Sequence, residues 1–260
     1  MSVLLAVFLA LAGGLPHHNG RVAFVRCCGP TGIYSIAPGG GAQKLLFRPA
    51  ADDAPLEPAW SPNGKLIAYT PGNGIWVMRA NGSHRHRVAK TGTEPAWSED
   101  GRKLVFSDRG DIWLVRATGG GLTRLTRAKA DEFRPAWAPD DSEILYARGN
   151  AIWRMGKDGR GQHRLIRNAS DPAWSPGATH VAFLRGDVVW IAKRSGTGAR
   201  PVPGATGVAQ FAWSPDGRLL VTAPVDRGDL TVMATDGSGA RPLTGDSGDF
   251  HAWPAWQPVR

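Results

Sequence analysis

Six side chains that could take part in chemistry occupy one recurring position, directly before a Pro-Ala-Trp or Phe-Ala-Trp tripeptide. They comprise three carboxylates, one guanidinium, one amide and one indole, at Glu57, Glu94, Arg134, Asp171, Gln210 and Trp253. Carboxylates beside an arginine could act as acid, base and metal ligands, or they could form a polar surface that recognises a basic or mixed-charge peptide. No histidine shares this position, which disfavours catalysis. Recognition of a partner and a solvated funnel, whose polar groups only satisfy each other and water, both stay open.

Two longer connections carry aromatic and acidic residues that could extend the same surface. Residues 127–134 and 244–253 each place a phenylalanine close to acidic residues. Aromatic side chains are enriched where protein partners dock. The further candidates for partner binding are therefore Asp131, Phe133, Asp249, Phe250 and His251.

Other motifs associated with catalysis lack the residues that the chemistry needs. Residues 245–248 read Gly-Asp-Ser-Gly, like the nucleophile segment of trypsin-like proteases, but that mechanism needs a histidine and a carboxylate held by an unrelated fold. Neither a Gly-x-Ser-x-Gly elbow nor a glycine-rich phosphate loop occurs. His84 and His86 alternate with arginines, whose positive charge disfavours a divalent ion. We expect no catalytic residue, no metal and no cofactor.

The tripeptide that follows the six candidate positions marks an internal repeat. Its tryptophans are separated by 37 to 43 residues and lie at Trp60, Trp97, Trp137, Trp174, Trp213 and Trp256. A period near 40 is typical of propeller blades rather than of helical arrays or hexapeptide solenoids. Each unit also contains turn dipeptides such as Asn63-Gly64 and Asp216-Gly217, whose glycine supplies the positive φ of a tight hairpin.

The segments between these turns predict strands. Their apolar runs are four to six residues long and alternate with a period near two, and Gly or Pro interrupts them before a helix could form. One four-stranded sheet cannot bury both of its faces, whereas six sheets packed around an axis bury them against each other. The sequence therefore predicts an all-β protein, a six-bladed β-propeller with four-stranded antiparallel blades.

The two ends of the repeat complete each other. The last residues read PAWQPVR, an opening strand without its successors, and residues 19–48 supply three strands without an opener. We predict that strands from both ends share one blade, which leaves no free sheet edge at the seam. A single propeller domain is expected over residues 19–260, with blades at residues 254–260 with 19–48, 58–89, 95–127, 135–167, 172–203 and 211–244.

Residues 1–12 form an apolar run that is too short to span a bilayer and ends in Ala-Leu-Ala, a pattern that resembles a signal-peptide cleavage site. We predict a signal peptide at residues 1–12 and therefore a periplasmic or secreted protein without a membrane span. The run is preceded by no Lys or Arg, so an uncleaved start to the domain remains the alternative.

The net charge of +9 would favour anionic partners, since 31 Lys and Arg residues face 22 Asp and Glu. Many of these cations, such as Arg87, Arg124 and Arg164, fall in the last strand of a unit, where charge protects an exposed edge from pairing with other chains. We expect no nucleic-acid partner, unless residues 1–12 are retained. The two cysteines are adjacent, which excludes a disulfide framework.

Repeats that begin with a Pro-Ala-Trp-Ser-Pro-Asp-Gly pattern resemble the TolB-like β-propeller family, one of the WD40-like repeat families. Residues 213–217 reproduce the Trp-Ser-Pro-Asp-Gly stretch without change, and residues 243–244 keep the Leu-Thr ending of the repeat. The resemblance concerns the propeller part of that family only. It implies a periplasmic or secreted location and a protein partner held at the mouth of the central channel.

We therefore expect a non-enzymatic, monomeric binding protein that recognises a protein or peptide of the bacterial envelope. Two alternatives stay open. One is a small propeller hydrolase or lyase that acts on a polysaccharide, and the other is a stand-alone relative of the propeller domain of prolyl peptidases.

Overall fold

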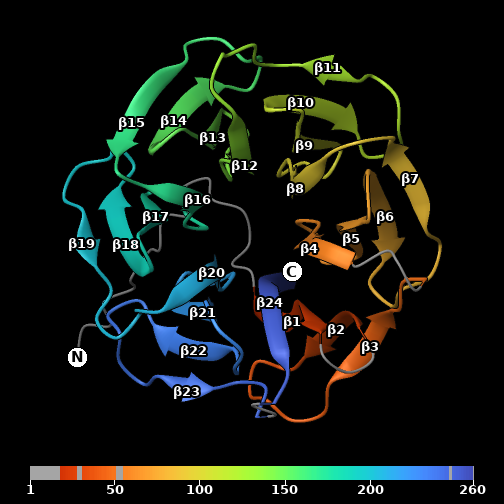
Figure 1. The fold of residues 1–260 in the computed structure, drawn as a ribbon, viewed down its shortest axis with the longest axis vertical. Coiled ribbons are helices and arrows are strands. Elements are labelled where there is room, and N and C mark those ends of the chain that lie inside the picture. Colours follow the sequence, from red (N-terminus) through yellow and green to blue (C-terminus); the bar gives the residue numbers. More distant parts are fainter. Residues whose placement is uncertain (1–17, 28–30, 51–54, 246–247, 260) are drawn as a thin grey trace, which may run out of the picture.

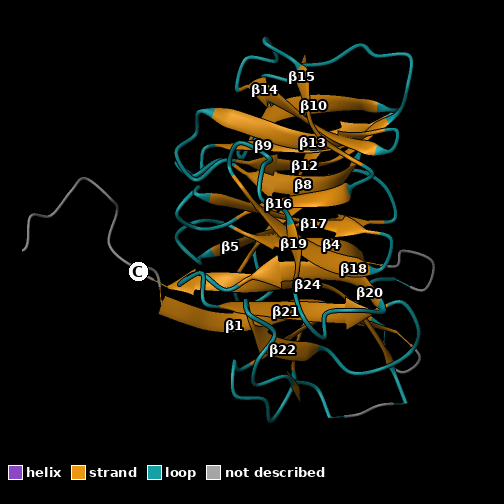
Figure 2. Ribbon diagram, turned by 90° about the vertical axis from the view of Figure 1, so that its left-hand side faces the viewer, coloured by secondary structure: helices purple, strands orange, loops and turns teal. Residues whose placement is uncertain are grey.

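The computed structural model describes residues 18–27, 31–50, 55–245 and 248–259, and within them it contains strands and turns but no helix. Its 24 strands form six four-stranded sheets. The sheets stand like blades around a common axis (Figure 1). Seen from the side, the inner strands run along that axis, so that turns collect on two opposite faces (Figure 2). The predicted six-bladed, all-β propeller is confirmed.

Each blade runs from an inner strand near the axis to an outer strand at the rim, and neighbouring strands are antiparallel. The first three blades are β24 (Phe250–Val259), β1 (His18–Cys27), β2 (Gly32–Ile36) and β3 (Lys44–Phe47); β4 (Pro55–Trp60), β5 (Leu66–Pro71), β6 (Ile75–Arg79) and β7 (His86–Ala89); β8 (Thr93–Trp97), β9 (Lys103–Asp108), β10 (Asp111–Arg116) and β11 (Thr123–Arg124). The other three are β12 (Glu132–Trp137), β13 (Glu143–Arg148), β14 (Ala151–Gly156) and β15 (His163–Arg167); β16 (Ser170–Trp174), β17 (His180–Arg185), β18 (Val188–Lys193) and β19 (Arg200–Pro201); β20 (Val208–Trp213), β21 (Leu219–Pro224), β22 (Thr231–Ala234) and β23 (Arg241–Pro242).

Strands from both ends of the chain close the ring, as the incomplete terminal repeats predict. β24 pairs antiparallel with β1, and Val22 lies opposite Trp256 in that ladder. The pairing is the longest in the molecule and extends to the last described residues, where His18 lies opposite Val259. This seam leaves β3 as the outer strand of its sheet, equivalent to the outer strands of the other five blades.

The repeated tryptophans of the inner strands pack between neighbouring blades. Trp97, for example, is 7% exposed and joins apolar residues of its own blade and of the preceding blade, including Leu104 and Val77, in one core cluster. Its Nε1 donates a hydrogen bond of 2.9 Å to the carbonyl oxygen of Ala59 in the preceding blade. Large aromatic side chains thus supply much of the apolar area that holds one blade against the next.

The tryptophans of the third strands, Trp76, Trp113, Trp153 and Trp190, are less enclosed than five of the six inner-strand tryptophans. They are only partly buried, and an arginine guanidinium lies over each ring. The shortest of these distances are 4.3 Å from Arg148 to the ring of Trp153 and 4.4 Å from Arg185 to the ring of Trp190. Nearer the rim the blades diverge, so a charged side chain covers the aromatic face in place of a neighbouring sheet.

Glycines in the third turns allow each blade to touch the outer strand of the blade before it. Gly82 has a φ of +86°, and a Cβ atom there would lie 1.9 Å from the carbonyl oxygen of Leu46. Gly237 meets the carbonyl oxygen of Pro203 in the same way, at 2.1 Å. Only glycine permits both the positive φ and this close approach of two backbones.

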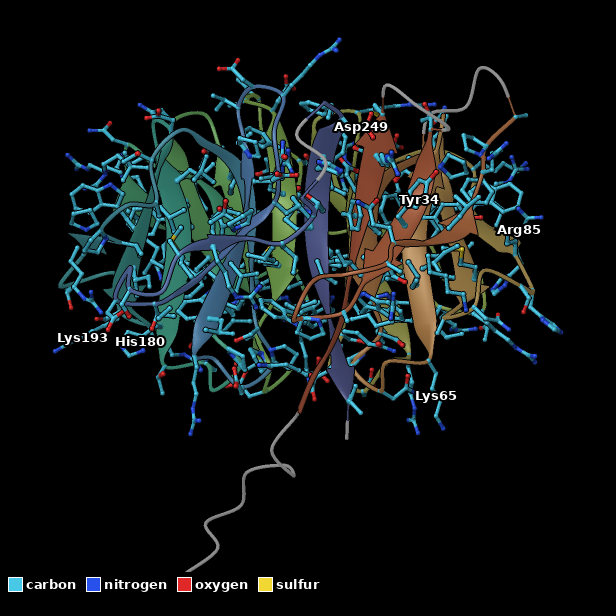
Figure 3. The ribbon with its side chains drawn as sticks, turned by 90° about the horizontal axis from the view of Figure 1, so that it is seen from below. Tyr34, Lys65, Arg85, His180, Lys193 and Asp249 are labelled. Atoms are coloured by element: carbon cyan, nitrogen blue, oxygen red, sulfur yellow. The ribbon has the colours of Figure 1, made fainter. Side chains whose placement is uncertain are left out.

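The two faces of the propeller can be told apart by single residues. Asp249 lies toward one end of the axis, and Lys65 and Lys193 lie toward the other (Figure 3). Among the described residues, no helix is long and apolar enough to cross a membrane. The predicted signal peptide at residues 1–12 lies outside the described part of the chain.

Candidate binding site at the channel mouth

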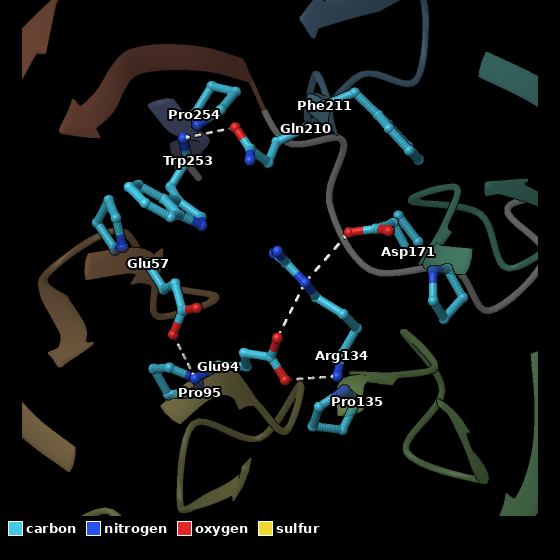
Figure 4. Close-up of a pocket in the computed structure, with 13 residues that line it drawn as sticks. Glu57, Glu94, Pro95, Arg134, Pro135, Asp171, Gln210, Phe211, Trp253 and Pro254 are labelled. Atoms are coloured by element: carbon cyan, nitrogen blue, oxygen red, sulfur yellow. Dashed lines mark hydrogen bonds and ion pairs between the residues drawn. The ribbon is translucent and has the colours of Figure 1, made fainter. Parts of the chain in front are cut away.

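The structure brings the six candidate residues together around one end of the channel. Each comes from the inner strand of a different blade, and together they line a cavity of about 170 Å³ (Figure 4). The wall also includes the following Pro of five blades and Phe211. The residues of this channel mouth are Glu57, Glu94, Arg134, Asp171, Gln210 and Trp253.

A local break in the sheet turns these side chains toward the axis. In the second blade the register between β4 and β5 shifts between Leu56 and Ala59, and the inner strands of four other blades shift at the equivalent place. In β20 the shift lies earlier, between Val208 and Gln210, and Gln210 pairs with Ala223. Glu57 adopts a φ of 58° within this bulge, and four of its equivalents lie between 48° and 58°. A β-bulge re-aims a side chain, and a non-glycine residue in this region carries conformational strain.

Gln210 is the exception among the six mouth residues. Its φ is not positive, and the residue after it is Phe211, whereas the other five blades have proline at that position. Phe211 nevertheless lines the cavity. Phe211 was not among the predicted site residues. The signal that could have identified it is the replacement of proline by phenylalanine at one of six equivalent positions.

Hydrogen bonds pass from blade to blade around the mouth. The Glu57 carboxylate accepts the backbone N–H of Glu94 at 2.5 Å, and the Glu94 carboxylate accepts the backbone N–H of Arg134 at 2.7 Å. The side-chain oxygen of Gln210 lies 3.5 Å from the backbone nitrogen of Trp253 in the same relation. The bulges free these N–H groups from the sheet, and the side chain of the preceding blade satisfies them.

Arg134 ties two of the carboxylates together across the mouth. Its Nε lies 2.9 Å from Glu94 and 3.1 Å from Asp171 (Figure 4). The hydroxyl of Ser107 donates a further hydrogen bond of 2.7 Å to Glu94. These charges are partly shielded from solvent, so their attraction exceeds that of a fully exposed pair.

The pKa of Glu57 lies well above that of an ordinary glutamate. Its pKa is raised from 4.5 to about 7, first by burial and then by the negative charge of Glu94, against the hydrogen bond from the Glu94 backbone and the charge of Arg134, which both lower it. Burial and a like charge both disfavour the ionised carboxylate. Glu57 therefore changes its charge near neutral pH.

Only some of the further candidates lie near this mouth. Asp131 and Phe133 line an adjoining cavity of about 440 Å³ that shares Glu94 with the mouth. Asp131 is exposed, and its carboxylate lies against Gly110. These two residues stay candidates for contact with a partner.

The remaining candidates belong to the seam between the ends of the chain. Asp249 is 8% exposed and forms an ion pair with Arg26. His251 is fully buried, and its Nδ1 lies 2.9 Å from the carbonyl oxygen of Gly228. Phe250 is partly buried and lies opposite Cys27. Asp249 and His251 are thus poorly placed for an exposed docking surface, since the pairing of β24 with β1 takes His251 into the sheet and the ion pair with Arg26 holds Asp249. Phe250 stays a candidate for contact with a partner.

The opposite end of the channel is mostly apolar. A cavity of about 570 Å³ is lined there by five of the inner-strand tryptophans, by the prolines of five Trp-x-Pro segments and by Glu99, which takes the place of proline after Trp97. The recurring Trp-x-Pro pattern could have predicted this chamber. The channel thus joins a polar, charged end to a mostly apolar one.

The described residues offer few of the arrangements that catalysis requires. Among them, no group of three or more His, Cys, Asp or Glu residues is placed to hold a metal ion. His84 and His86 lie exposed on the rim side of β6, far in the fold from the mouth. Of the Gly-Asp-Ser-Gly segment, residues 246–247 lie outside the described part of the chain.

Comparisons with known proteins agree with this architecture. A family model for the TolB beta propeller domain matches residues 17–260. No curated protein matches the chain. TolB from Acinetobacter baumannii is similar in structure, with a TM-score of 0.79 and 22% identity over 92% of this chain and 66% of that one. The chain therefore spans slightly less than two thirds of that TolB.

Other solved structures share the fold with lower identity. A nidogen/laminin complex gives a TM-score of 0.77 at 11% identity, covering 91% of this chain and 98% of that one. An oligogalacturonate lyase in complex with manganese gives 0.60 at 15% identity, covering 83% and 71%. Likeness at this level of identity establishes the fold and leaves function to the residues of the site.

Proposed function

The chain belongs to the TolB beta propeller family, and from that premise we propose that it is a non-enzymatic binding protein that holds a protein or peptide at the channel mouth. Its location would be the bacterial periplasm or the cell exterior, and its partner a component of the envelope. The protein would act as a monomer, without a nucleic-acid partner and without a membrane span.

The observation that carries this proposal is the construction of the mouth. Six blades each contribute one side chain to the same cavity, and five of those residues have a positive φ that costs conformational energy. A closed ring could form with ordinary strands at these positions. The strain is therefore better explained by the placement of side chains for recognition, on a scaffold rigid enough to hold them.

Photo-crosslinking can test whether a partner reaches the mouth. Benzoylphenylalanine would replace Phe211, which lines the cavity, or Leu122, which is 57% exposed in the turn between β10 and β11. We expect an adduct with an envelope protein from the position 211 variant and none from the position 122 variant. Equal adducts from both positions, or none at 211 in cells that produce the protein, would reject binding at the mouth.

The location has its own test. Fractionation of cells that produce the full chain should recover it outside the cytoplasm, and sequencing of the mature amino terminus should show that residues 1–12 are gone. A cytoplasmic protein that retains these residues would reject export and would make nucleic-acid binding the better use of the +9 net charge.

A second candidate function follows from the likeness to the manganese-bound oligogalacturonate lyase, whose propeller shares this fold. In that case the mouth carboxylates and Arg134 would serve an elimination on a polysaccharide. Metal analysis of the purified protein and incubation with oligogalacturonides would decide between the candidates. Bound manganese or calcium together with turnover would establish the lyase. If the protein holds no metal and turns over no substrate, the binding function is the one that stands.

A further inference from the structure

The charges of the mouth are not balanced. Three carboxylates share one guanidinium, and the Nε of Arg134 is already engaged by Glu94 and Asp171. Glu57 receives only the backbone N–H of Glu94, and among the described residues no cation forms an ion pair with it. One carboxylate oxygen of Glu57 therefore faces the cavity without a counterion.

Trp253 lies beside this unpaired carboxylate. Figure 4 shows its indole ring between Glu57 and Gln210, at the side of the mouth opposite Asp171. An aromatic face attracts a cation, so this ring can help to hold a positively charged group beside the Glu57 carboxylate.

The size of the cavity limits what can enter. At about 170 Å³ it is smaller than the roughly 300–1,000 Å³ of pockets that enclose drug-sized ligands. It therefore admits one end group of a larger molecule. A group that suits this corner carries a single positive charge, which the Glu57 carboxylate and the face of the Trp253 ring both attract.

We infer that the mouth binds one primary ammonium group between the Glu57 carboxylate and the Trp253 indole, supplied by a lysine side chain or by the amino terminus of a peptide. This inference rests on the proposed function, because it names the group by which the partner is held.

Binding of this kind is coupled to a proton. The charged groups that face Glu57 from the other inner strands are Glu94 on β8, Arg134 on β12 and Asp171 on β16, whereas Gln210 on β20 and Trp253 on β24 do not titrate. Because the pKa of Glu57 is raised to about 7, the carboxylate is mostly protonated at pH 6 and mostly ionised at pH 8. An alkyl ammonium stays charged throughout this range, as lysine does. The affinity for an alkyl ammonium should therefore rise about tenfold from pH 6 to pH 8, in proportion to the ionised fraction of Glu57. A peptide amino terminus, with an ordinary pKa of about 8, is itself partly deprotonated at pH 8 and should show a smaller rise.

Calorimetric titration of the full chain with n-butylamine at pH 6 and pH 8 measures this coupling directly. Two peptides then separate the sources, one with a free amino terminus and no lysine, the other acetylated and with one lysine. An acetylated arginine peptide tests whether a guanidinium is accepted instead. Glu57→Gln keeps an oxygen for the Glu94 N–H, and Asp226→Asn removes a carboxylate from an exposed loop outside the cavity as the matched control.

We expect n-butylamine to bind the wild type and Asp226→Asn with the tenfold rise, and Glu57→Gln to lose the rise and at least tenfold in affinity at pH 8. Trp253→Phe should bind the ammonium peptides more weakly while it keeps the pH dependence. No binding of any ammonium probe, binding to Glu57→Gln equal to the wild type, or preference for the arginine peptide overturns the inference. If one of these contrary results occurs while the benzoylphenylalanine variant at position 211 still crosslinks to a partner, the proposed function stands and only the ammonium site fails.

Discussion

The substitution Glu57→Gln should make the protein more stable at alkaline pH, although it removes a residue of the proposed site. The raised pKa means that the folded state holds the Glu57 proton more tightly than the unfolded state does. Between pH 4.5 and about 7 the folded wild type binds more protons than the unfolded chain, so its free energy of unfolding decreases as the pH rises. Glutamine does not ionise, and this decrease disappears.

The size of the effect follows from the shift in pKa. From 4.5 to about 7 is 2.5 units, and each unit is worth about 1.4 kcal/mol, which gives an upper limit of about 3 kcal/mol at pH 8. The mouth is open to water, which reduces the cost of the charge, so we expect about 1–3 kcal/mol. In a protein of this size that corresponds to a melting temperature roughly 2–10 °C higher.

Thermal unfolding of the wild type, Glu57→Gln and Asp226→Asn at pH 4 and pH 8 provides the assay. The Gln variant should match the wild type at pH 4 and exceed it at pH 8, and Asp226→Asn should follow the wild type at both. Parallel stability curves for wild type and Glu57→Gln, with no gain at pH 8, would refute the reasoning. In that case Glu57 would be ionised in the fold at no cost.

Three further pairs of substitutions test how the blades are held together. Trp97→Phe should lower the free energy of unfolding by about 1 kcal/mol more than Trp137→Phe in urea titrations, because Trp97 loses its bond to the Ala59 carbonyl, whereas Nε1 of Trp137 has no partner among the described residues. Gly82→Ala should cost about 2–5 kcal/mol, since it adds a clash with the Leu46 carbonyl to the strain of a positive φ, and Gly239→Ala, with open space around it, should cost about 1–2 kcal/mol. Trp256→Ala should cost about 3–5 kcal/mol at the seam, and the partly buried Trp76→Ala should cost measurably less in the same assay. If both variants of a pair lose the same free energy of unfolding, the contact assigned to the first variant of that pair is contradicted.

The repeat allowed the fold to be predicted because each local signal agreed with the others. A tryptophan that recurs about every 40 residues indicates that each repeat places it in the same structural environment. Asn-Gly or Asp-Gly pairs mark the hairpins between strands. The incomplete repeats at the two ends then require a shared blade, and Val22 does lie opposite Trp256. The same periodicity brought the six mouth residues to one place, since equivalent positions in a ring lie around one axis.

The conformation of the mouth could not be predicted from the same signals. A residue before proline is normally extended, so the positive φ of Glu57 and Arg134 runs against local preference and accompanies a bulge in the inner strand that no local signal announces. Burial of His251 depends on the register between β1 and β24, which a sequence read along one strand does not contain. The arginines over the third-strand tryptophans depend likewise on how far neighbouring blades diverge.

The two expected effects of Glu57→Gln point in opposite directions, and their combination is more informative than either alone. A residue kept for stability should weaken the fold when it is replaced, whereas Glu57 is an acid held where burial and Glu94 oppose its charge. Such a residue costs stability in the free protein, and the cost is removed when a cation arrives to pair with it. A variant that melts at a higher temperature and no longer binds n-butylamine would therefore mark Glu57 as a group retained for its ligand. A variant that is less stable and binds equally well would return the mouth to a purely structural role.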